Sequence, residues 1–134
     1  MRAKKKNTGM VFLMTIFAIA LLSAVVMGIL QINTEEIQLM RNQVYAAQAL
    51  AIAEAGLNDV FAKIWEQQDW AEDSYTKSFN GGSYNVSVTG TLPNRTIVSR
   101  GTTSQGFIAK LEANVTVDSD YPYVVRIDGL RINE

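Results

Sequence analysis

The longest uninterrupted apolar segment of the chain runs from Met10 to Leu30. As an α-helix it would be about 31 Å long at 1.5 Å per residue, which is enough to cross the hydrocarbon core of a bilayer. No charged side chain occurs between Lys6 and Glu35. The pattern therefore predicts a transmembrane helix over residues 10–32.

The next segment, residues 33–66, keeps a helical pattern but becomes amphipathic. It contains no proline, and glycine is absent from Ile29 to Ala55. We expect the helix to continue through this segment, giving a single helix of about 55 residues and about 80 Å. Its apolar stripe needs a cover, because it lies outside the span. The stripe consists of Ile37, Met40, Val44, Ala47, Leu50 or Ala51, Leu57, Phe61, Ile64 and Trp65.

After residue 66 the pattern changes to an alternation of apolar and polar residues, rich in Thr, Ser, Val, Tyr and Ile. This alternation predicts β-strands separated by turns. The expected strands are Ser74–Phe79, Ser83–Leu92, Arg95–Thr102, Phe107–Val117 and a possible fifth at Tyr123–Ile132. The turn signals are Asn80-Gly81-Gly82, Pro93-Asn94 and Ser104-Gln105-Gly106.

Two of the predicted strand segments, Tyr84–Val88 and Leu111–Val117, have one apolar and one polar face. This is typical of an antiparallel sheet with one buried side. About sixty residues of sheet are marginal as an independent domain. We therefore expect an α+β fold, in which an antiparallel β head at residues 67–134 packs on residues 33–66 of the helix.

The composition disfavours several classes of function. The chain has no cysteine and no histidine, so it lacks a thiolate nucleophile, the commonest general base and the usual zinc ligands. From Met10 onward it carries 8 basic and 13 acidic residues, a formal charge of −5. Such a segment is a poor candidate for binding nucleic acid. We find no phosphate loop, dinucleotide fingerprint or serine elbow, and we expect neither catalysis nor a cofactor.

Residues 1–9 form a basic leader that contains Arg2, Lys4, Lys5 and Lys6. All four positive charges lie on one side of the predicted span. The positive-inside rule therefore predicts a cytoplasmic N-terminus and a head outside the cytoplasmic membrane, in the periplasm or at the cell surface.

The leader and the first helix resemble known sequences. Lys4-Lys5-Lys6-Asn7-Thr8-Gly9, followed at once by Met10-Val11-Phe12-Leu13, looks like the class III signal of type IV pilins. Farther on, Glu36-Ile-Gln-Leu-Met-Arg41-Asn42 and Ala49-Leu-Ala-Ile-Ala53-Glu54-Ala55-Gly56-Leu57 resemble the first helix of PilX-type minor pilins. The resemblance covers about residues 4–60 and is only generic in the sheet.

This resemblance implies cleavage between Gly9 and Met10 by a prepilin peptidase and methylation of the new N-terminus. It also implies assembly with other pilin subunits by an inner-membrane platform, as in a pilus, a secretion pseudopilus or a DNA-uptake machine. The implied processing residues include Lys4, Lys5 and Lys6, and the implied helix contacts are Met14, Gly28, Glu36, Arg41, Glu54 and Gly56. Most major pilins have a glutamate where this chain has Met14. That absence favours a tip, initiating or low-abundance subunit, because a carboxylate would offset the cost of burying the N-terminal amine.

Plainer interpretations stand beside this one. The span could be an ordinary signal anchor of a single-pass protein whose periplasmic head binds a partner, or a Sec signal peptide cut near Ala24. An enzyme is the least favoured class. Gly28 could mark a place where the helix unwinds or a simple packing position. Glu54 could occupy the polar side of the helix or contact another subunit, and Gly56 could allow a close approach of the sheet.

Three weaker features lie in the predicted head. Asp118 and Asp120, with Asp128, could bind calcium through carboxylate oxygens, but turn-forming aspartates are the favoured explanation because no loop has EF-hand spacing. Asn85, Asn94 and Asn114 each begin an Asn-x-Ser/Thr triplet, which is the acceptor for N-glycosylation. Strands with alternating Thr and Ser also produce such triplets by chance. Tyr121 and Tyr123 could form an exposed edge or belong to the core.

Overall fold

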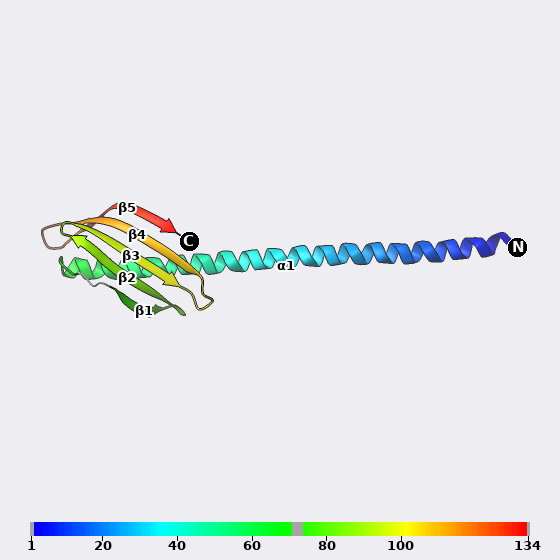
Figure 1. Cartoon of the computed structure of the whole chain (residues 1–134), viewed down its shortest axis with the longest axis horizontal. Helices are drawn as coiled ribbons and strands as arrows, with labels where there is room; N and C mark the ends of the chain where they lie inside the picture. Colours follow the sequence, from blue (N-terminus) through cyan, green and yellow to red (C-terminus); the bar gives the residue numbers. More distant parts are fainter. Residues whose placement is uncertain (1, 71–73, 134) are drawn as a thin grey trace. The chain divides into compact units, whose positions relative to one another are not determined.

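The computed structural model describes residues 2–70 and 74–133. Helix α1 (Arg2–Glu66) is followed by five strands, labelled in Figure 1. The strands are β1 (Tyr75–Phe79), β2 (Gly82–Thr91), β3 (Asn94–Thr102), β4 (Ile108–Val117) and β5 (Val125–Asn133). The predicted α+β fold is confirmed, and each predicted strand end lies within two residues of the observed end.

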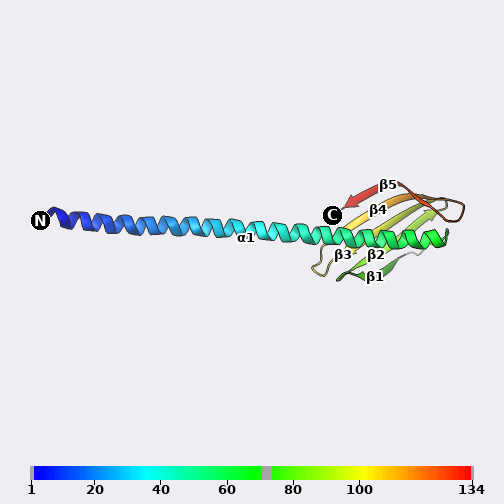
Figure 2. The same ribbon diagram turned by 180° about the vertical axis from the view of Figure 1, so that it is seen from behind.

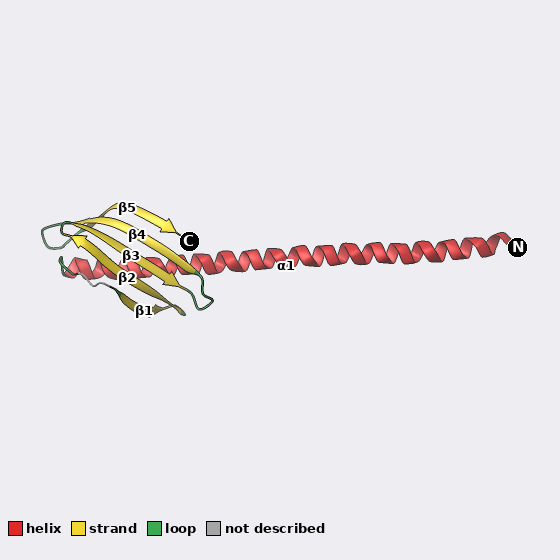
Figure 3. Cartoon of the chain, viewed as in Figure 1, coloured by secondary structure: helices red, strands yellow, loops and turns green. Residues whose placement is uncertain are grey.

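The chain divides into two compact units. The first, Met1–Arg41, contains only turns of α1, and the second, Asn42–Glu134, contains the rest of α1 and the sheet. Within the second unit, the C-terminal turns of α1 lie against the sheet in both opposite views (Figures 1 and 2). Figure 3 shows the helix in red and the five strands in yellow.

The sheet is an antiparallel meander in the order β1-β2-β3-β4-β5. Asn80 and Gly81 connect β1 to β2, and both have positive φ angles, of 47° and 77°. Positive φ at both central residues is the conformation that an Asn-Gly hairpin turn favours. The pairing of β4 with β5 is irregular between Asn114 and Val115 of β4, which lie opposite Gly129 and Ile127 of β5.

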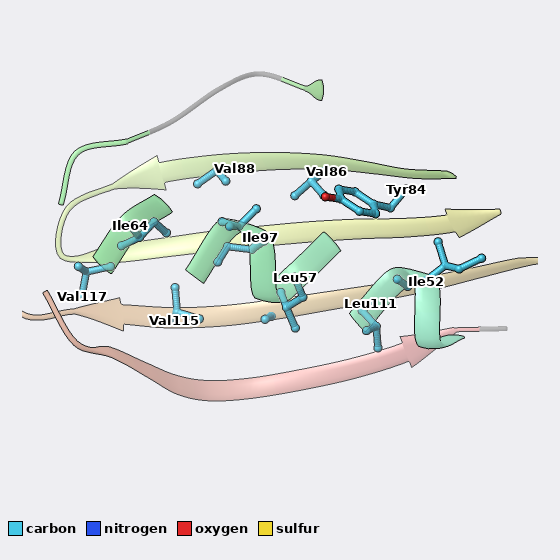
Figure 4. Packing of buried hydrophobic residues seen from close by; sticks show 13 residues of the cluster. Ile52, Leu57, Ile64, Tyr84, Val86, Val88, Ile97, Leu111, Val115 and Val117 are labelled. Carbon is cyan, nitrogen blue, oxygen red and sulfur yellow. The ribbon is translucent and has the colours of Figure 1, made fainter. Parts of the chain in front are cut away.

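Alternate residues of β2, β3 and β4 face the helix and form the core of the second unit. The helix contributes Ile52, Leu57, Val60 and Ile64, all buried. Figure 4 shows three of these side chains, Ile52, Leu57 and Ile64, between α1 and the sheet. The strand residues in the core are Tyr84, Val86, Val88, Ile97, Leu111, Ala113, Val115 and Val117.

One part of the sequence prediction needs correction, namely which face of the helix the sheet covers. Leu57 and Ile64 of the predicted stripe are buried, but Val44 and Trp65 are 63% and 47% exposed. The covered face instead follows a line of buried residues at helical spacing: Ala49, Ile52, Ala53, Gly56, Leu57, Val60 and Ile64. The helix of the second unit therefore has two apolar faces, and the prediction had merged them into one stripe.

Candidate functional site

The candidate processing site lies in the first unit, on regular helix. Gly9 and Met10 are both exposed, and a side chain at Gly9 would meet no other atom within 4 Å. The side chains of Lys4, Lys5 and Lys6 lie outside the described residues. The structure therefore places the Gly9–Met10 bond on an accessible helical surface.

The apolar segment of the first unit is long enough to cross a membrane. Its large side chains are exposed, and the candidate residue Met14 is 68% exposed. The hydroxyl of Thr15 donates a hydrogen bond to the carbonyl oxygen of Val11, 2.8 Å away. This bond satisfies the polar hydroxyl within the helix, as a hydrocarbon environment requires.

Gly28 lies within continuous helix, and a Cβ there would meet no atom within 4 Å. The structure therefore shows no unwinding at this position. Glu36 and Arg41 are also helical and exposed in the first unit, and Glu54 is exposed in the second. Glu54 thus faces solvent, three residues after Ala51 on the same side of the helix; a subunit contact remains a prediction.

The helix of the second unit exposes five apolar residues on one side, which we call the outer face: Val44, Ala47, Ala51, Ala62 and Trp65. The first three residues follow one another at intervals of three and four, which places them on one side of a helix. All five are exposed. The exposed residues Glu54 and Asn58 lie on the same side, between Ala51 and Ala62. The sheet of the same chain therefore leaves this face uncovered.

The covered face approaches the sheet closely at Gly56. A Cβ at this position would collide with the hydroxyl of Ser99 and lie 3.0 Å from the ring of Tyr84. The Ser99 hydroxyl donates a buried hydrogen bond of 2.6 Å to the carbonyl oxygen of Ala53. Gly56 thus allows a strand hydroxyl to reach the helix backbone. This is the close approach of the sheet that the sequence suggested for Gly56.

A polar cluster at one flank of the helix was missed in the sequence. Tyr75 and Tyr84 both donate hydrogen bonds to Oδ2 of Asp59, at 2.7 and 3.1 Å. Lys63 lies 3.8 Å from the same oxygen, and its ammonium sits 3.8 Å from the ring centroid of Tyr75. The i,i+4 spacing of Asp59 and Lys63 is visible in the sequence, but the tyrosines come from β1 and β2.

These contacts shift the pKa values of two members of the cluster. Burial alone would raise the pKa of Asp59, but the two tyrosine hydrogen bonds and the positive charges of Lys63 and Lys77 outweigh it and lower the pKa. Burial, together with the bond to the Asp59 carboxylate, raises the pKa of Tyr84 to about 12. Asp59 is therefore ionised and Tyr84 neutral at physiological pH, so the cluster links helix to sheet rather than supplying a base near neutrality.

The calcium candidates do not form a recognisable site. Within residues 2–70 and 74–133, no group of three or more His, Cys, Asp and Glu side chains is placed to hold a metal ion. The backbone N–H of Asp118 donates a hydrogen bond to the carbonyl of Val124, which joins the two ends of the loop between β4 and β5. Asp128 accepts hydrogen bonds from Thr116 and Arg126, and these bonds lower its pKa. The structure does not place Asp120 in such a group either.

The two tyrosines beside Pro122 have different environments. Tyr121 is 71% exposed, whereas Tyr123 is half-buried and packs against the core. Their rings meet edge to face at 5.7 Å. Tyr121 therefore lies at an exposed edge, and Tyr123 belongs to the core, so each of the two predicted alternatives applies to one of these tyrosines.

Comparison with known proteins gives no relative on which to base a function. No family model, no curated protein and no solved structure matches the chain. The functional argument therefore depends on the sequence and on the surfaces described above.

Proposed function

We propose that this chain is a minor pilin-like subunit of a type IV pilus or a related filament, and that it acts by assembly rather than catalysis. The observation that carries the proposal is the outer face of α1. It carries five exposed apolar side chains, interrupted by Glu54 and Asn58, and belongs to the same unit as the β head, yet no part of the described chain covers it. A surface of this kind is typical of an interface with another protein.

The composition of the outer face favours a helix as the partner. Ala47, Ala51 and Ala62 have small side chains, which let two helix backbones approach closely. The exposed apolar side chains of residues 10–30 need the same kind of cover once a subunit leaves the bilayer. Bundling of helices from several subunits would provide it, replacing lipid as the apolar environment.

The remaining steps of the proposal come from the sequence. The leader orients the N-terminus to the cytoplasm and the head to the periplasm or cell surface. A prepilin peptidase cleaves after Gly9, the new N-terminus at Met10 is methylated, and an inner-membrane platform assembles the subunit with others. Because Met14 carries no charge to pair with that N-terminus, we place the subunit at the tip or the start of a filament.

Measurement of intact mass tests the proposal. The full chain is expressed with and without a prepilin peptidase, beside a pilin that the enzyme is known to process. We expect the loss of residues 1–9 and the gain of one methyl group only when the peptidase is present. A Gly9→Val variant is the matched control and should keep its full length.

An unchanged mass beside a processed control pilin would contradict the proposal. It would favour the alternative of a single-pass membrane protein with a periplasmic binding head. A binding head needs a recognition surface, and the solvent-facing side of the sheet offers a candidate for one.

A further inference from the structure

A row of polar side chains crosses the whole sheet on the side away from the helix. Asn85 of β2 pairs with Arg100 of β3, Arg100 pairs with Lys110 of β4, and Lys110 pairs with Asn133 of β5. Thr76 of β1 extends the row, and its hydroxyl accepts a hydrogen bond of 3.0 Å from the amide of Asn85. Two cations therefore occupy the centre of the row, with one amide side chain on each side.

This row forms the floor of a hollow of about 580 Å³. Two apolar side chains complete its lining. Val98 is half-buried, and Ile108 is 42% exposed. The hollow thus combines a pair of positive charges, hydrogen-bonding amides and a short apolar wall.

The two cations are incompletely neutralised within the described part of the chain. Lys110 lies 3.8 Å from Glu112, and both side chains are partly exposed to solvent. Arg100 makes no ion pair with any described residue. Like charges directly opposite each other on neighbouring strands destabilise a sheet. The position of Arg100 opposite Lys110 therefore does not serve the stability of the sheet. Binding of a negatively charged ligand would explain it better.

The arrangement suits one oxyanion rather than a polyanion. The Cβ atoms of residues opposite each other in a sheet are only about 5 Å apart, so Arg100 and Lys110, which line the same hollow, are close enough to reach one group. The formal charge of −5 from Met10 onward would repel a polymer of phosphates. The amide oxygen of Asn85 remains an acceptor for a hydroxyl, because its amide nitrogen already donates to Thr76.

We propose that this hollow binds a negatively charged sugar, with Arg100 and Lys110 on its carboxylate, Asn85 and Asn133 on its hydroxyls, and Val98 and Ile108 against its ring. The inference goes beyond the proposed assembly function and does not depend on it. A subunit of a surface filament and a periplasmic binding head could both use such a site.

Calorimetric titration of the full chain tests the proposal. The protein is kept in a polyoxyethylene detergent, whose headgroup carries neither sugar nor phosphate. The probes are sodium glucuronate, glucose and inorganic phosphate. We expect glucuronate to bind with a Kd on the order of 1 mM, as for a good ligand of this size, and the other two at least tenfold more weakly.

Variants assign the binding to the hollow. Arg100→Gln combined with Lys110→Gln should weaken glucuronate binding at least tenfold. Arg126→Gln removes the same kind of charge from the highly exposed side chain of Arg126 on β5, outside the hollow, and should leave binding unchanged. Arg100→Gln should also raise the unfolding temperature by about 1–4 °C, because it removes the like-charge pair.

The wild-type protein provides a readout that needs no variant. Glucuronate should shift the NMR signals of the Asn85 side-chain amide and the Arg100 guanidinium more than those of Asn114 and Arg126. Absence of binding at 50 mM glucuronate, equal binding by the double variant, or equal binding of glucose would overturn the proposal. Equal binding of phosphate would overturn its sugar-specific part.

Discussion

The two faces of α1 in the second unit both carry apolar side chains, yet only one of them is buried. Ile52 and Val60 on the covered face are fully buried, whereas Val44 on the outer face is 63% exposed. The covered face runs from Ala49 to Ile64 without a charged residue, whereas Glu54 and Asn58 interrupt the outer face. The covered face also carries Gly56, which lets β3 approach the helix backbone. The comparison teaches that the sheet covers the face that is both continuously apolar and closely packed.

The largest expected effect comes from filling the close contact on the covered face. Gly56→Val would drive a branched side chain into Ser99 and Tyr84 and should lower the free energy of unfolding by about 2–4 kcal/mol. Ala51→Val on the outer face is the matched control and should change it by less than about 0.5 kcal/mol. Urea unfolding measures both, followed by the fluorescence of Trp65 and Trp70. Similar losses in the two variants would mean that the faces do not differ as described.

A smaller effect is expected at the polar flank of the covered face. Tyr84→Phe removes one hydrogen bond to Asp59 and should cost about 1 kcal/mol at pH 7. The pKa of Tyr84 is about 12 in the folded protein, above its usual value of 10.0. Its contribution is therefore fully present below pH 10 and is lost as the pH rises towards 12, because the unfolded chain releases this proton first.

The measurement is the urea midpoint at pH 7, 9 and 11, followed by circular dichroism. The wild type should lose more stability between pH 9 and 11 than Tyr84→Phe does. Tyr121→Phe, at a side chain that is 71% exposed, should behave like the wild type. An identical alkaline decline in wild type and Tyr84→Phe would contradict the role given to Tyr84.

The smallest effect on stability, and the sharpest test of the comparison, is expected on the outer face. Ala51→Glu places a charge on an exposed helical position and should change the free energy of unfolding by less than about 0.5 kcal/mol. If the outer face packs against a second helix, the same change should reduce association at least tenfold, because the charge would be buried without a partner.

Sedimentation of the full chain in detergent measures this association. Thr89→Glu adds the same charge at an exposed position of β2, on the side of the sheet away from the helix, and should leave association unchanged. Normal association of Ala51→Glu would remove the outer face from the proposed interface.

Local patterns were sufficient to predict the elements of this protein. The uncharged run from Met10 to Leu30 determines a helix able to span a membrane, because length and hydropathy are properties of a segment. Alternation and turn residues likewise located the strands, and Asn80-Gly81 adopts the predicted turn because its positive φ angles suit those two residues. The Gly9–Met10 site remains a sequence prediction that only processing can test.

Tertiary structure decided which of these residues meet. The close approach of Ser99 to Gly56 depended on how β3 packs on the helix, which helical spacing does not encode. Asp59 meets Tyr75 and Tyr84 across 16 and 25 residues, and Arg100 lies beside Lys110 only through the register of β3 and β4. Periodicity fixes which face of its own element a residue occupies, whereas contacts between elements depend on how the elements pack and on strand register.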